Sequence, residues 1–181
     1  MKQKRFASIL VALALMAMLI PTAYAYMVHK SQTVANSFVP AYVDCEIEEA
    51  FDGENKSSIQ VKNTSNIDAY IRVRLVFYWV DSKGNVVARN MVPPTVTCDN
   101  DWIKGDAFTY YYKHVVEPGA PTKNLLSASI SMNPVVETVT GTQYFYYPVV
   151  EVMAEAIQSL PETAVEEAWD VTIVDKVITN A

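Results

Sequence analysis

The stretch AYIRVRLVFYW, residues 69–79, decides the fold class of this chain. Apolar side chains occupy every odd-numbered position from Ala69 to Trp79, whereas arginines and tyrosines fill most of the even-numbered positions. A period of two over this length, rich in branched and aromatic residues, is typical of a strand with one buried face. The following DSKGN, residues 81–85, predicts a hairpin turn into residues 86–88, because Gly and Asn tolerate positive φ.

Similar alternation recurs on both sides of this stretch. We predict further strands over residues 41–48, 59–62, 108–113, 125–132 and 144–158, and strand-like residues return over 171–178. Pro148 indicates an edge position or a bulge, because proline cannot donate a ladder hydrogen bond. Pro161 and Glu162 suit the first turn of a short helix ending near Trp169, with Ser159 as a candidate N-cap. The pattern predicts an all-β fold: an antiparallel two-sheet sandwich, jelly-roll-like, with one short C-terminal helix.

Residues 1–25 have the order of a secretory signal peptide. A positively charged head precedes the uncharged residues 6–20, and Ala23 and Ala25 form the small-x-small pattern that signal peptidase cleaves. The uncharged run is shorter than the roughly 20 residues that span a bilayer as a helix. We therefore favour cleavage after Ala25 over an uncleaved anchor, and expect a secreted or cell-surface protein without a membrane span.

Cleavage would leave 156 of the 181 residues and remove three positive charges, so the formal net charge would fall from −6 to −9. A protein this acidic is a poor ligand for nucleic acid or for an anionic membrane, because both would repel it. We expect an N-terminal segment over residues 26–40 and a single β-sandwich domain over residues 41–181.

The two cysteines, Cys45 and Cys98, leave two alternatives open. Export permits a disulfide between them, and closing a loop of that length would stabilise the fold by roughly 4 kcal/mol in the chain-entropy model. Two separate buried thiols are the other alternative.

No recognisable catalytic motif occurs in the sequence. His29 and His114 lie outside any His-Glu-x-x-His pattern, and there is no Gly-x-Ser-x-Gly elbow and no phosphate-binding glycine loop. Asp99 and Asp101 flank an asparagine and form a weak candidate for Ca²⁺, but a polar turn is the favoured interpretation. We predict that the protein is not an enzyme and has no cofactor, with a hydrolase of cryptic site as a minor alternative.

Tyrosines gather over residues 110–112 and 144–147. Tyr111 and Tyr146 could form an exposed surface that binds glycans or proteins. The favoured alternative is that half of these rings face the core and half cover neighbouring strands.

Several motifs resemble one family. They are Ala25-Tyr26-Met27 followed by TVANSF (33–38), KNTSNIDAYIRV (62–73), EPG (117–119) followed by Thr122 and Leu125, and VMAEAIQ (152–158). Together they resemble the TasA/camelysin-like group of exported Gram-positive proteins with a SipW-type signal peptide.

The resemblance implies a jelly-roll-like sandwich, export through a dedicated signal peptidase, and a place in the cell envelope or the extracellular matrix of a biofilm. Matrix members of that group form fibres when the N-terminal segment of one subunit completes the sheet of the next. The corresponding donor strand here lies within residues 26–40 and contains Val34, Phe38 and Val39. We expect self-association, or association with other matrix subunits, in a structural protein. A secreted binding module is the alternative.

Overall fold

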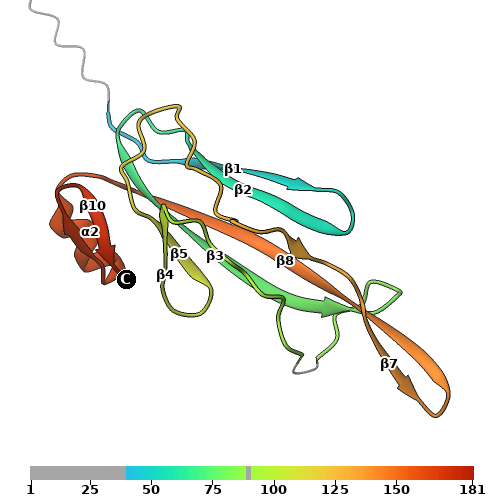
Figure 1. The fold of residues 1–181 in the computed structure, drawn as a ribbon. Helices are drawn as coiled ribbons and strands as arrows, with labels where there is room; N and C mark the ends of the chain where they lie inside the picture. The colour runs from blue at the N-terminus through green and yellow to red at the C-terminus, as the bar shows by residue number, and fades with distance from the viewer. Residues whose placement is uncertain (1–39, 89–90) are drawn as a thin grey trace, which may run out of the picture. The chain divides into compact units, whose positions relative to one another are not determined.

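The computed structural model describes residues 40–88 and 91–181. Ala41–Ala181 form one compact unit, described here by itself. It consists mainly of antiparallel sheets with one short C-terminal helix (Figure 1), which confirms the predicted all-β class. The jelly-roll-like arrangement of two sheets stays a prediction. The predicted signal peptide with Ala23 and Ala25, and the donor residues Val34, Phe38 and Val39, lie outside the described residues. In the described part of the chain, no helix is both long enough and apolar enough to cross a membrane.

The described strands form three sheets. The strands are β1 (Cys45–Phe51), β2 (Asn55–Asn63), β3 (Ala69–Val80), β4 (Trp102–Lys104), β5 (Thr109–Tyr112), β6 (Ile130–Ser131), β7 (Val135–Val139), β8 (Thr142–Gln158), β9 (Thr172–Val174) and β10 (Val177–Asn180); the helix is α2 (Glu162–Trp169). The orders are β1-β2-β6, β4-β5-β3-β8-β7 and β10-β9.

Strand β3 is the centre of the five-stranded sheet, as its alternation predicted. It pairs antiparallel with residues 147–158 of β8, from Ala69 opposite Gln158 to Val80 opposite Tyr147. The predicted hairpin after β3 is reduced to a turn and one bridge, between Val80 and Val86. The bridge replaces a full strand because the chain turns away into the proline-containing stretch that follows.

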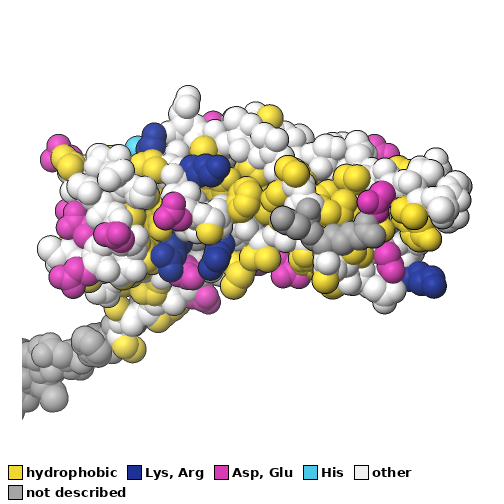
Figure 2. Space-filling model, turned by 90° about the horizontal axis from the view of Figure 1, so that it is seen from below, with side chains coloured by type: hydrophobic (Ala, Val, Ile, Leu, Met, Phe, Trp, Pro, Cys, Tyr) yellow, Lys and Arg dark blue, Asp and Glu magenta, His cyan; other side chains and the backbone are white. Residues whose placement is uncertain are grey.

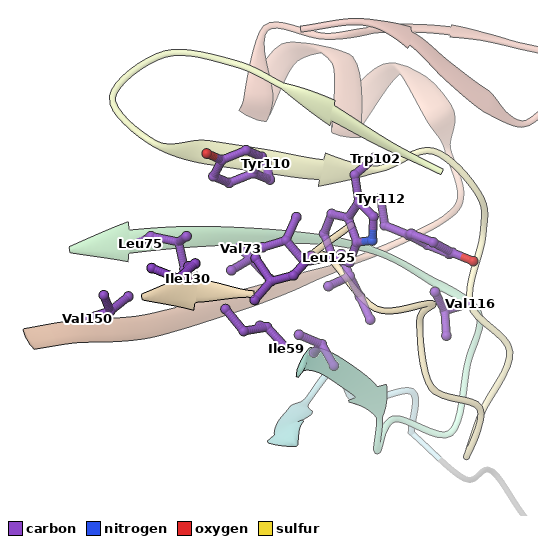
Figure 3. Close-up of a cluster of buried hydrophobic side chains, with 13 residues drawn as sticks. Ile59, Val73, Leu75, Trp102, Tyr110, Tyr112, Val116, Leu125, Ile130 and Val150 are labelled. Atoms are coloured by element: carbon purple, nitrogen blue, oxygen red, sulfur yellow. The ribbon is translucent and has the colours of Figure 1, made fainter. Parts of the chain in front are cut away.

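The five-stranded and three-stranded sheets share one apolar core, which makes the fold sandwich-like. Figure 3 shows Ile59 of β2 facing Val73 and Leu125, with Tyr110 and Trp102 above them. The fully or almost fully buried members are Ile59, Val61, Ile71, Val73, Leu75, Trp102, Tyr110, Tyr112, Val116, Leu125, Leu126, Ile130 and Val150. Their burial is the main favourable contribution to folding of this unit.

The C-terminal residues form a second apolar cluster on the other side of the five-stranded sheet. Helix α2 and the β9-β10 hairpin bury Val165, Trp169 and Ile178 against Tyr70 of β3 and Tyr111 of β5. The helix is confirmed, but the predicted N-cap at Ser159 is wrong. Pro161 is the N-cap residue, no side chain caps the helix, and the Ser159 N–H donates to the Asp68 carbonyl.

Three other expectations differ from the structure. The expected strand over residues 125–132 is reduced to β6, because side chains of Thr122 and Asn124 replace part of a regular ladder beside β2. Strands β4 and β7 lie outside every stretch for which the sequence predicted a strand. Both segments are short and alternate weakly. They are strands because β4 pairs with β5 and β7 pairs with β8.

The first part of β8 extends away from the body of the unit with β7 (Figure 1). Residues 142–146 pair with β7, and from Tyr147 onward β8 pairs with β3 on its other side. Pro148 follows the last β7 pair and lies opposite Trp79. Its edge position is therefore confirmed.

Candidate strand-addition site between β1 and β8

Along one edge of β8, residues 150–156 pair with no other strand in the described part of the chain. The N–H groups of Ala69 and Leu75 donate to Val116 and Phe108, on the β5 side of β3. Even-numbered residues of β3 therefore face β8, where they meet the odd-numbered residues of its ladder. It follows that the even-numbered residues from 150 to 156 turn their N–H and C=O groups away from β3. No described strand pairs with them.

Strand β1 has an edge of the same kind, with no strand of residues 40–88 or 91–181 paired to it. The odd-numbered β2 residues Ile59, Val61 and Asn63 bond to residues 119–125, so the even-numbered ones face β1. The odd-numbered β1 residues, Cys45 to Glu49, therefore direct their backbone groups away from β2.

These two free edges face each other, and we call the gap between residues 45–49 and 150–156 the seam. Cα atoms of β1 and β8 approach within 8 Å, yet the two strands share no ladder among the described residues. Glu49 lies near Val150 through Lys56, and Cys45 lies near Glu155, so β1 and β8 run antiparallel across the seam.

The side chains along the seam are incompletely covered. Cys45 and Ile47 from β1, and Val152, Ala154 and Ala156 from β8, point to the core but are only half-buried. Core positions elsewhere on the same sheet, such as Val73, are fully buried. An additional strand at the seam would therefore gain both backbone hydrogen bonds and apolar contact.

One end of the seam opens into an apolar hollow of about 540 Å³. Its lining residues are Glu49, Phe51, Lys56, Met132, Pro148, Val149 and Val150. Lys56 is buried there, and its Nζ contacts the Glu49 carboxylate and lies 3.3 Å from the Val150 carbonyl oxygen. Nothing in the sequence pattern singles out Lys56, because its inward orientation depends on a bulge beside it in the β1-β2 ladder.

The rim of the seam is acidic. Glu46, Glu48, Glu151 and Glu155 are exposed on the two strands. Residues 26–39, by contrast, contain Lys30 and no acidic residue. The negative rim would therefore repel another acidic surface of the protein but would not repel residues 26–39.

The cysteines are both free thiols, so the Cys45–Cys98 bridge is absent and the alternative of separate thiols holds. Cys45 pairs with Asn63 in β1-β2, whereas Cys98 is bridged to Leu126, so different neighbours hold the two backbones. Burial, followed by the carboxylates of Asp44 and Glu155, raises the pKa of the Cys45 thiol. The reactivity of the Cys45 thiol can therefore report on the end of the seam that lies away from Lys56.

The alternative in which Tyr111 and Tyr146 form an exposed ligand surface does not agree with the structure. Both are buried, at 8% and 7% exposure. The Tyr111 ring packs against Trp169 of α2, with 5.9 Å between ring centroids, so the C-terminal cluster covers it. The residues around Tyr111 in the sequence do not indicate that Trp169 packs against it.

Asp99 and Asp101 form the polar turn that was the favoured interpretation. Asp99 Oδ1 accepts the Asp101 N–H at 3.0 Å. The Asp101 carboxylate pairs with Lys123 at 2.5 Å and with His114 at 3.3 Å, and the hydrogen bond from Lys123 is the main reason that its pKa is lowered. Within residues 40–88 and 91–181, no three potential His, Cys, Asp or Glu ligands gather around a common point.

The chain matches no protein-family model, no curated protein and no solved structure. The resemblance to the TasA/camelysin-like group therefore rests on the short motifs alone. The seam itself, which is a property of this chain's own geometry, is the basis for the functional argument.

Proposed function

We propose that this protein is an exported structural subunit of the cell surface or extracellular matrix, and that it assembles by strand addition at the seam. The observation that carries the proposal is the edge of β8 at half-buried Val152, Ala154 and Ala156, whose outward backbone groups pair with no strand among the described residues. A long unprotected edge is the usual template for pairing with another chain.

Residues 26–40 of a second copy are the proposed occupant. The segment contains Val34, Phe38 and Val39, has no glycine, and lacks the negative charge of the rim. Removal of residues 1–25 would leave it at the new N-terminus. Assembly would then be confined to the outside of the cell, in agreement with what the family resemblance implies.

The first test compares the chain from Tyr26 to Ala181 with the chain that lacks residues 26–40. We expect filaments from the longer chain and folded monomers from the shorter one, by electron microscopy and light scattering. Filaments of unchanged abundance from the shorter chain would contradict the donor role.

The second test blocks the edge without removing the donor. Ala154→Pro deletes an N–H that faces away from β3, so the β3-β8 ladder keeps its bonds. Pro148 shows that this side of β8 accommodates proline. We expect loss of assembly with the fold retained by circular dichroism. Met153→Ala, at an exposed neighbouring position, is the matched control and should assemble normally.

A binding module is the second candidate, now based on different residues. The β7-β8 hairpin exposes Val136, Tyr144, Phe145 and Tyr147. Figure 2 shows hydrophobic side chains exposed across the middle and right of one face, toward the end where Figure 1 places this hairpin. Binding of a glycan array by the monomer, lost in Tyr144→Ala and Tyr147→Ala, would favour this function.

A further inference from the structure

Lys56 is the one charged residue that is buried in the described part of the chain. Burying an ammonium group costs several kcal/mol unless partners compensate for the lost water. A lysine near the end of a strand would ordinarily reach solvent along its flexible stem. Its inward orientation therefore calls for a physical explanation.

A β-bulge turns this side chain inward. The ladder between β1 and β2 shifts register between Ala50 and Phe51, so that Phe51 pairs with Lys56. Without the shift, Lys56 would share the outward face of Ser58 and Gln60. The bulge places it on the same face as Ile59, because one extra residue reverses the alternation.

The buried ammonium group links three strands. It starts on β2, contacts the Glu49 carboxylate on β1, and reaches the Val150 carbonyl on the free edge of β8. An inward-pointing charge that occupies an edge carbonyl is a known way to protect a sheet edge from other chains.

This link bears on strand addition, because the seam is too narrow for another strand. A strand between two others needs about 9.6 Å, two ladder spacings. The Cα atoms of β1 and β8 approach within 8 Å. The Cys45 end of β1 must therefore move outward before a second copy can pair with β8, while the Lys56 contact holds the Glu49 end near Val150.

We propose that Lys56 and Glu49 form a latch that pins β1 to β8 at Val150 and confines strand addition to residues 152–158. This inference rests on the proposed function and specifies the register of the partner. The open part of the edge has seven residues, the same length as residues 33–39 of a second copy. The acidic rim around Glu46 and Glu155 adjoins this open part, and residues 26–39 bring no negative charge to it.

Lys56→Met tests the latch, since methionine has a similar length but no charge and no donor. The matched control is Lys62→Met, which removes the same charge from the outward face of the same strand. Both are made in the chain from Tyr26 to Ala181. Cys45 alkylation in the monomer and amide hydrogen exchange before and after assembly are the two measurements.

The monomer measurement does not depend on assembly. Freeing β1 should expose Cys45, so Lys56→Met should accelerate its alkylation relative to Lys62→Met, whereas Cys98 should react at an unchanged rate. Equal Cys45 rates in the two variants would overturn the latch. If Lys56→Met does not fold, Glu49→Gln serves instead, because Glu49 is exposed and the change keeps its volume.

The assembled state gives the register. In the unsubstituted chain, amides of Val152, Ala154 and Ala156 should become protected on assembly, and that of Val150 should not. In Lys56→Met, protection should extend to Val150 by about two- to tenfold, the worth of one added hydrogen bond. Val150 protection in the unsubstituted assembly would overturn the latch. A chain that never assembles contradicts the proposed function, while the Cys45 rates still decide the latch.

Discussion

The five-stranded sheet has one outer face that is sealed and one edge that is open. On the sealed face, α2 and the β9-β10 hairpin bury Tyr70, Val165 and Ile178 completely. At the open edge, Val152 and Ala154 of β8 remain half-buried although they point to the main core. Helix α2 and the β9-β10 hairpin thus cover the sealed face. At the open edge, the contact of Lys56 with the Val150 carbonyl protects β8. The difference shows where an added strand would gain the most.

The largest expected effect is a difference in stability between substitutions on the sealed face and substitutions at the open edge. Trp169→Ala should lower the free energy of unfolding by about 3–5 kcal/mol, because a buried ring is lost. That ring packs against Tyr111 and lies 5.0 Å below the Arg72 guanidinium. Ile47→Ala at the seam should cost about half as much, because Ile47 is only half-buried. Denaturant titration measures both, and equal losses would contradict the contrast between the regions.

High pH should destabilise the sealed face and the core. Burial raises the pKa values of Tyr70 and Tyr110 to about 12, from an ordinary value of 10.0. The folded state therefore favours the neutral phenols, and their contribution to stability is complete below pH 10 and is lost as the pH rises toward 12. The ultraviolet absorbance of tyrosinate, followed with stability over this range, should show both residues ionising last. Ionisation of every tyrosine near pH 10 in the folded protein would contradict this burial.

Removal of either hydroxyl should have a smaller and opposite effect. Among the described residues, the buried Tyr70 and Tyr110 hydroxyls find no hydrogen-bond partner. Tyr70→Phe and Tyr110→Phe should each raise the free energy of unfolding by about 1 kcal/mol, because an unsatisfied polar group leaves the interior. Thermal unfolding measures the change. Destabilisation by either substitution would reveal a partner for that hydroxyl.

The smallest effect concerns the open edge and changes reactivity rather than stability. Because the pKa of the Cys45 thiol is raised above 9.0, its alkylation should be slow at neutral pH and should keep rising above pH 9. Assembly should slow it further, since an added strand would cover the thiol. Cys98, away from the seam, is the internal reference. Equal protection of both thiols on assembly would place the contact elsewhere.

Local patterns foretold those parts of the fold that depend on one segment. The alternation of residues 69–79 identified β3, and good helix formers after Pro161 identified α2. Short segments such as β4 and β7 were missed, because their strand state comes from a partner rather than from their own periodicity. The environment of Tyr111 could not be predicted for the same kind of reason, because Trp169, which packs against it, lies far along the chain.

The sequence by itself determined an antiparallel, all-β unit with one C-terminal helix, because alternation and turn residues act over a few positions. Only the tertiary structure decided that no described strand pairs with the outer edge of residues 150–156, that Lys56 is buried beside this edge, and that Cys45 and Cys98 remain separate. Each of these depends on which distant segments meet. Lys56 shows this most clearly, because one bulge in β1-β2 converts a residue on an outward strand face into a buried link between three strands.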